Sequence, residues 1–171
     1  MVETIATYTD IVAALAVVVS LIFVGLQMRA NTRATRAASA SATSNATGEW
    51  YWSVGTSAEA SMLLWTFITS PEKLSEAERF QGIFLLHGVV LTFQNSFFLS
   101  KQGSLDESIR GSIMAAIIAV KDTPGWRIFW QQRRAIFYPD FQDYVDGLLE
   151  SKETLSEGLY ANVATPPGPR D

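Results

Sequence analysis

The longest apolar stretch of the chain lies near its N-terminus. Residues 11–28, IVAALAVVVSLIFVGLQM, carry no charge, and only Ser20 and Gln27 are polar. Extended back to Tyr8, the stretch has about 20 residues and would form a helix roughly 30 Å long, which matches the hydrocarbon core of a bilayer. The pattern therefore predicts one transmembrane helix over 11–28, preceded by a short external N-terminus, residues 1–10.

The charges around this stretch predict its orientation. Arg29, Arg33 and Arg36 follow the span, and residues 29–48 contain no acidic side chain. Because basic residues concentrate on the cytoplasmic side, we expect the N-terminus outside and the rest of the chain in the cytoplasm. Tyr8 would lie at the outer membrane interface and the three arginines, which share one helical face, at the inner interface. The arginines have two open interpretations. They are flanking charges that stop translocation, or they form a specific site for lipid phosphates.

A stretch of small and polar residues separates the span from the rest of the chain. Residues 29–48 are almost all Ala, Ser, Thr, Asn and Arg, and the next large apolar residue is Trp50. Nothing in this stretch breaks a helix, so we expect a stalk that continues the transmembrane helix. A flexible linker is the alternative, because Ser, Thr and Asn are mediocre helix formers.

Residues 49–160 show helix signals throughout, and no segment alternates like a strand. Capping-box patterns begin at Thr56, Ser75 and Ser104, and Thr123-Pro124 places a cap before a first-turn proline. Apolar side chains recur at helical spacing in three stretches. They are Ile109, Ile113, Ile117 and Val120; then Trp126, Phe129, Trp130 and Phe137; then Phe141, Tyr144, Val145, Leu148 and Leu149. We therefore predict an all-α fold in which a bundle of about five short-to-medium helices follows the stalk, with a Pro-rich tail over 161–171.

A second apolar stretch, residues 80–99, needs a separate interpretation. It reads FQGIFLLHGVVLTFQNSFFL, and His87, Gln94 and Asn95 interrupt its apolar character. These polar residues favour the central helix of the bundle over a second transmembrane span. A third interpretation is that this apolar surface rests on the membrane or on another membrane protein.

Composition narrows the classes of function. The 171 residues suffice for one domain, and 12% aromatic residues with 18% charged residues exclude a disordered chain. The absence of Cys excludes disulfides, Cys-based zinc sites and thiol catalysis. A net charge of -4 argues against nucleic acid as a partner.

Few residues are candidates for chemistry. His87 is the only histidine of the chain. A lone histidine, with no second histidine or cysteine to share a metal or a proton, is more often a buried packing residue than a catalytic one. A series of carboxylates near the C-terminal end fits a solvated acidic helix face. Its members are Asp140, Asp143, Asp146, Glu150, Glu153 and Glu157. We therefore expect no catalytic residue, no metal, no cofactor and no enzymatic activity.

Two groups of residues are candidates for binding. Trp50, Tyr51 and Trp52 are adjacent and cannot share one helix face, so at least one is expected at a partner contact. A second group is a candidate pocket for a small apolar ligand. It comprises Phe84, His87, Leu91, Gln94 and Phe98. Ala16-x-x-x-Ser20 is a weak signal for a homo-oligomer through the span.

The order of these features resembles a widespread family of small, uncharacterised bacterial proteins with one N-terminal transmembrane helix and a helical cytoplasmic domain. The resemblance covers nearly the whole chain. Its segments are SLIFVGLQ (20–27), MRANTRATRAA (28–38), EW (49–50), SPEKLSEAERF (70–80), FQNSFF (93–98), GSLDE (103–107), TPGWRIFWQQRR (123–134) and FYPDFQDYVD (137–146). The resemblance implies a bacterial inner-membrane location and supplies no activity.

Two functions follow as expectations. The first is a non-catalytic accessory or scaffolding subunit that binds the bilayer and other subunits of a larger inner-membrane complex, with a photosynthetic or respiratory assembly as a candidate host. The alternative is a single-pass sensor or regulator that binds a small apolar ligand between its cytoplasmic helices.

Overall fold

The computed structural model describes the backbone of residues 2–152 and the side chains of residues 13–152. This part of the chain is helical and contains no strand. Its elements are α1 (Val2–Gly55), α2 (Ala58–Thr69), η1 (Pro71–Lys73), α3 (Glu76–Lys101), α4 (Glu107–Val120), α5 (Pro124–Arg133), η2 (Arg134–Ile136) and α6 (Pro139–Glu150). The expected all-α fold with an apolar N-terminal helix is confirmed. The side chain of Tyr8, the residues Glu153 and Glu157 and the tail 161–171 lie outside the described residues.

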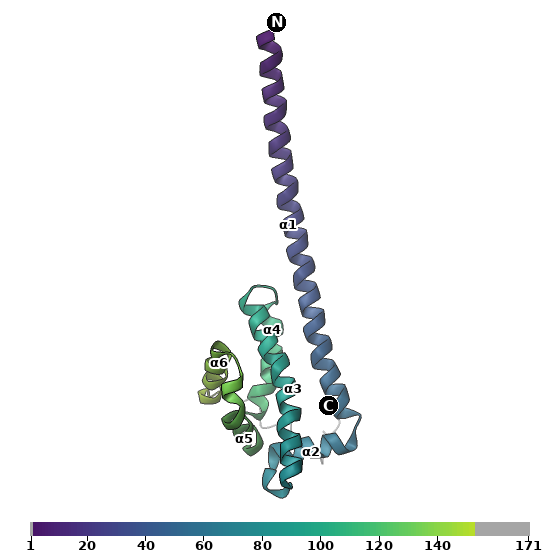
Figure 1. The fold of residues 1–171 in the computed structure, drawn as a ribbon, viewed down its shortest axis with the longest axis vertical. Coiled ribbons are helices and arrows are strands. Elements are labelled where there is room, and N and C mark those ends of the chain that lie inside the picture. Colours follow the sequence, from purple (N-terminus) through teal and green to yellow (C-terminus); the bar gives the residue numbers. More distant parts are fainter. Residues whose placement is uncertain (1, 153–171) are drawn as a thin grey trace, which may run out of the picture.

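Helix α1 contains both the expected span and the expected stalk. Its 54 residues make a helix about 80 Å long, which projects far beyond the other helices (Figure 1). Residues 29–48 are helical throughout, although they are rich in Ser and Thr. Several hydroxyls donate to the carbonyl four residues earlier, as Thr32 does to Met28 at 2.9 Å and Thr47 to Thr43 at 2.9 Å. In these bonds the hydroxyl groups find acceptors within the helix, so they do not compete with the backbone hydrogen bonds that form it.

The C-terminal half of α1 packs along α3, and the two helices run antiparallel. The Arg36 Nε donates to the Gly103 carbonyl at 2.9 Å, and 14 residues later the Trp50 Nε1 donates to the Leu85 carbonyl at 3.0 Å. The same side of α1 carries a row of buried and half-buried positions spaced alternately three and four residues apart, as in a coiled coil. We call this row the α1 seam: Ala40, Thr43, Thr47, Trp50 and Val54.

The alanines that recur every fourth residue near the middle of the stalk lie outside this seam. Ala38, Ala42 and Ala46, which follow a four-residue step, are all exposed. A four-residue step drifts around a helix, whereas the alternating spacing of the seam stays on one side. Contact with the domain begins at Arg36, inside the stretch expected to form the stalk.

Helix α3 is the centre of the domain, with α1, α2, α4 and α5 packed around it. The core between these helices is aromatic, and Phe67, Trp126, Phe129 and Phe141 are almost completely buried. The three apolar stripes expected for α4, α5 and α6 face this core, with the exception of Ile109. Burial of these faces holds the helices together, because apolar area removed from water contributes about 25 cal/mol per Å².

The helix caps agree with the sequence patterns in two of four cases. Ser75 forms a full capping box with Glu78, and Thr123 caps α5 with a proline in the first turn. The patterns at Thr56 and Ser104 were wrong by one and two residues. Helix α1 runs to Gly55 and the Thr56 hydroxyl bonds back to it, so Ser57 caps α2. Asp106 caps α4 because residues 102–105 are used in the turn that follows α3.

Candidate binding surfaces

The three adjacent aromatic residues near the end of α1 point in different directions. The Trp50 indole is half-buried against α3 through its bond to Leu85, and Tyr51 meets it edge to face at 5.2 Å. Trp52 is 75% exposed. Successive helix positions are rotated by about 100°, which places these side chains on three sides of α1. Trp52 is the most exposed member of this group.

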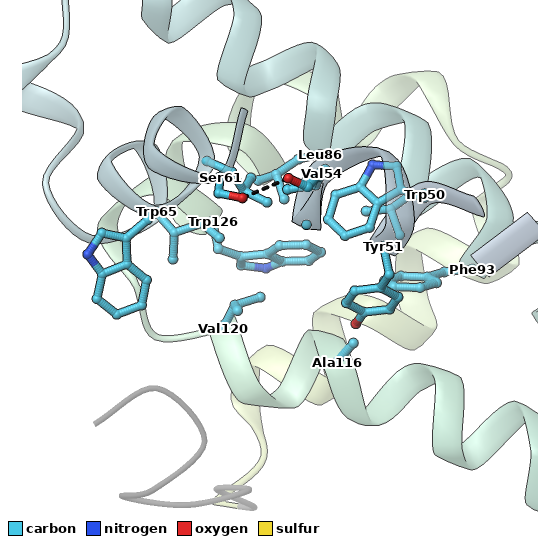
Figure 2. Close-up of a pocket in the computed structure, with 14 residues that line it drawn as sticks. Trp50, Tyr51, Val54, Ser61, Trp65, Leu86, Phe93, Ala116, Val120 and Trp126 are labelled. Atoms are coloured by element: carbon cyan, nitrogen blue, oxygen red, sulfur yellow. Dashed lines mark hydrogen bonds between the residues drawn. The ribbon is translucent and has the colours of Figure 1, made fainter. Parts of the chain in front are cut away.

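An apolar hollow lies where the end of α1 meets α2, α3, α4 and α5. Its volume is about 240 Å³, and Figure 2 shows the side chains around it. We call it the aromatic hollow. Its main walls are Trp50, Tyr51, Trp65, Leu86, Val120 and Trp126. The Tyr51 and Trp65 side chains are partly exposed and form its rim, whereas Trp126 is buried at its centre. Sequence reasoning missed this hollow because its residues come from five separate helices.

The aromatic hollow has few polar groups. The Ser61 hydroxyl donates to the Val54 carbonyl at 2.7 Å, the bond drawn in Figure 2. The Trp50 Nε1 donates to the Leu85 carbonyl. The Trp126 Nε1, by contrast, is buried and has no hydrogen-bond partner among the described residues. The ring that carries it stacks on Trp130, with a centroid distance of 6.2 Å and an interplanar angle of 7°.

The five residues expected to line a ligand pocket share one side of α3 but do not enclose a common cavity. Phe84, Leu91 and Phe98 are exposed, and His87 and Gln94 are half-buried beside them. Phe84 borders a hollow with α2, whereas Gln94 and Phe98 border a second hollow with the start of α6. His87 and Leu91 line neither of these hollows. The neighbouring helices pack on the other sides of α3 and leave this side open.

This open side is an apolar surface on the domain. It runs along α3 at four- and seven-residue steps, which keep its members on one helix face. We call it the α3 outer face: Phe80, Phe84, Leu91 and Phe98. The Arg133 guanidinium lies over the Phe84 ring, 5.1 Å from its centroid, and Phe98 stacks on Tyr138 at 6.2 Å.

His87 lies between this face and the aromatic core. Its ring is 5.3 Å from that of Phe137 and 6.4 Å from that of Phe129, and its Nδ1 has no partner among the described residues. Burial lowers the pKa of His87, and the positive charge of Arg133 lowers this pKa further. The imidazole is therefore neutral at pH 7, and its contacts are those of a packing residue.

Carboxylates of α6 pair with basic side chains and an indole N–H of the same domain. Asp146 accepts from the Trp130 Nε1 at 2.8 Å and from the Arg134 Nε and Nη2 at 2.8 and 2.6 Å. The hydrogen bonds from Arg134 hold the pKa of Asp146 below its usual value. Asp140 pairs with Lys101. The expectation of a purely solvated acidic face is therefore corrected at Asp146, which joins α6 to α5. Among the described residues, no group of three or more His, Asp or Glu side chains could hold a metal ion.

The arginines after the span differ from one another. Arg29 and Arg33 are exposed, whereas Arg36 bonds to the Gly103 carbonyl. About 12 Å of helix separates Met28 from Arg36, so the turn after α3 lies close to the end of the apolar segment.

Helices α1 and α3 are both long and apolar enough to cross a membrane. In the most apolar 18-residue stretch of α1 no residue is buried, whereas 39% of the corresponding stretch of α3 is buried within the protein.

Comparison of the chain with protein-family models, with curated proteins and with solved structures gives no match. The function is therefore inferred from two surfaces: the apolar segment of α1 and the α3 outer face.

Proposed function

We propose that this protein is a single-pass protein of a bacterial inner membrane, and that its cytoplasmic helical domain is a non-catalytic accessory or scaffolding subunit of a larger membrane complex. The apolar segment of α1 carries the proposal. Its large side chains, from Leu15 to Met28, are about half or more exposed, and no other part of the described chain covers them. A bilayer removes this surface from water, which is favourable by about 25 cal/mol per Å².

The attachment of the domain to α1 supports a scaffolding role. The two interhelical hydrogen bonds at Arg36 and Trp50, together with the α1 seam, fix the domain along the helix. The chain reverses after α2, so the C-terminal end of α3 and the Gly103 turn point back along α1 toward its apolar segment (Figure 1). The domain is thus held at a set height and rotation beside the bilayer.

The α3 outer face supports a protein partner. It presents several large apolar side chains on one helix, and contiguous exposed apolar surface of this kind is typical of interaction sites. Aromatic residues and arginine, both present here in Phe84 and Arg133, are enriched where partners bind. In this proposal α3 is a core helix with one face reserved for another subunit.

A size measurement with surface variants tests the accessory role. Full-length protein is extracted from its native membrane in a mild detergent, run on a native gel and analysed by mass spectrometry. We expect stoichiometric companions with the natural chain and with Gln131→Asp, an exposed change away from the α3 outer face. Phe84→Asp with Leu91→Asp is expected to lose the companions while keeping its helical circular dichroism spectrum. A free monomer for the natural chain would overturn the proposal.

A labelling experiment tests the orientation. The chain has no cysteine, so single substitutions give unambiguous sites for a membrane-impermeant thiol reagent. Thr4→Cys is expected to react in intact spheroplasts, whereas Gln131→Cys is expected to react only after the membrane is opened. The reverse pattern would invert the topology, and equal reaction of both sites would contradict a single membrane span.

A further inference from the structure

We propose that Arg29, Arg33 and Arg36 form a binding site for the phosphate group of an anionic phospholipid, on the part of α1 that lies between its apolar segment and the Gly103 turn. The inference rests on the proposed membrane span of α1. It does not depend on the accessory role of the domain or on which side of the membrane the domain lies.

The three arginines lie on the side of α1 that packs on the domain. The α1 seam begins at Ala40, and its alternation of three- and four-residue steps, continued toward the apolar segment, gives Arg36, Arg33 and Arg29. Helix α1 continues past the turn that follows α3 (Figure 1). The seam is therefore buried or half-buried where α3 lies against it, and it changes to exposed arginine where α3 ends.

The Arg36 guanidinium is fixed by the domain with its outer nitrogens still free. Its Nε donates to the Gly103 carbonyl at 2.9 Å, and neither Nη has a hydrogen-bond partner among the described residues. The hydrogen bonds from Ser108 lower the pKa of the nearby Asp106, and Arg36 lowers this pKa further, but the Asp106 carboxylate accepts from Ser108 rather than from Arg36. The two Nη groups thus form a fork for phosphate oxygens.

The charge of this part of α1 is not neutralised nearby. Residues 11–48 contain no acidic side chain, and Arg29 and Arg33 take part in no ion pair among the described residues. An anionic phospholipid supplies the missing negative charge, whereas the cationic headgroup of a zwitterionic lipid cancels much of it.

The depth of the arginines matches that of lipid phosphates. By helical rise, their Cα atoms lie about 1.5, 7.5 and 12 Å beyond Met28, the last residue of the apolar segment. The headgroup layer extends about 5–8 Å from the hydrocarbon core on each side. Side chains of a helix tilt toward its N-terminus, which here is the direction of the bilayer, so Arg33 and Arg36 reach back into this layer.

Native mass spectrometry of the full chain in detergent tests the site, because it resolves adducts of individual lipids. The probes are phosphatidylglycerol and phosphatidylcholine with the same acyl chains. We expect phosphatidylglycerol to bind at least tenfold more tightly, and an equal concentration of inorganic phosphate not to displace it. Equal affinities for the two lipids would overturn the site, and displacement by inorganic phosphate would assign it to the free anion instead of a lipid. Failure of the chain to insert into lipid nanodiscs would overturn the membrane span itself.

Three variants separate a built site from general attraction between charges. Arg36→Lys keeps the charge but loses the fork, and we expect it to weaken phosphatidylglycerol binding about tenfold. Arg33→Gln is expected to weaken this binding about fivefold, the usual contribution of one basic residue at a membrane surface. Arg79→Gln, the control, removes the same charge from an exposed position near the other end of α3 and is expected to change nothing.

Undiminished binding by Arg36→Lys, or equal weakening by Arg33→Gln and Arg79→Gln, would overturn the proposal. The comparison of Arg33→Gln with Arg79→Gln remains decisive even if Arg36→Lys disturbs the attachment of the domain, because both of these side chains are exposed.

Discussion

The Trp50 indole nitrogen donates a hydrogen bond to the Leu85 carbonyl at 3.0 Å, and this bond joins α1 to the middle of α3. The residues are 35 positions apart in the chain. The bond lies near the C-terminal end of the α1 seam, where the helix that carries the apolar segment meets the core. It therefore couples the position of the domain to α1.

Removing this bond is expected to weaken the attachment. Trp50→Phe keeps an aromatic ring but deletes the donor, and we expect a loss of about 1–2 kcal/mol in the free energy of unfolding. The measurement is urea unfolding of the full chain in detergent, followed by circular dichroism. Trp52→Phe, at a position that is 75% exposed, is the control and is expected to change stability by less than about 0.5 kcal/mol. Equal effects of the two substitutions would contradict the role of the bond.

A substitution in the α1 seam is expected to stabilise the protein. The Thr43 hydroxyl is buried and has no hydrogen-bond partner among the described residues. Thr43→Val replaces this hydroxyl with a methyl group of similar shape, and we expect a gain of about 1 kcal/mol in the same unfolding assay. Thr47→Val is the matched control, because the Thr47 hydroxyl already donates to the Thr43 carbonyl and gains nothing from removal. A loss of stability in Thr43→Val would show that the hydroxyl has a partner in the membrane-bound protein.

Gly125 marks the closest approach of α5 to α2. A Cβ atom at this position would lie 2.0 Å from the Phe67 carbonyl oxygen, a backbone atom that cannot move aside cheaply. Gly125→Ala is therefore expected to destabilise the domain by about 3 kcal/mol or more. Gly147→Ala is the control, since a Cβ there meets nothing within 4 Å and alanine favours the α6 helix by up to about 1 kcal/mol. Similar melting temperatures for the two variants would contradict the packing of α5 on α2.

His87 is expected to make stability depend on pH in a mildly acidic range. Burial and then Arg133 lower the pKa of His87 in the folded protein, so the unfolded chain binds its proton more readily. Stability is then fully present above about pH 6.5, the ordinary pKa of histidine, and decreases as the pH falls below that value. Urea midpoints at pH 7.5 and 5.5 measure the decrease, and His87→Gln is expected to remove most of it. An identical decrease in that variant would assign the effect to other groups.

The local parts of the structure follow from the sequence. The uncharged run from Ile11 to Met28 indicates an apolar helix, and the period of the apolar residues around Phe141 and Val145 indicates the buried face of α6. The caps at Ser75 and Thr123 are also predictable from the sequence, because each depends on residues within one helical turn. The binding surfaces are less predictable. The sequence grouped residues of α3 into a pocket, and the structure leaves them on an open face.

What the sequence by itself determined is which segments are helical and which side of each short helix is apolar, since both depend on residues a few positions apart. Only the tertiary structure decided which face of α1 packs on the domain, where Thr43 is buried while Ala42 is exposed. It also decided that Asp146 joins α6 to α5, and that Trp50, Trp65 and Trp126 meet around one hollow. These outcomes depend on how helices far apart in the chain cross, because a side chain's neighbours there come from other helices rather than from its own.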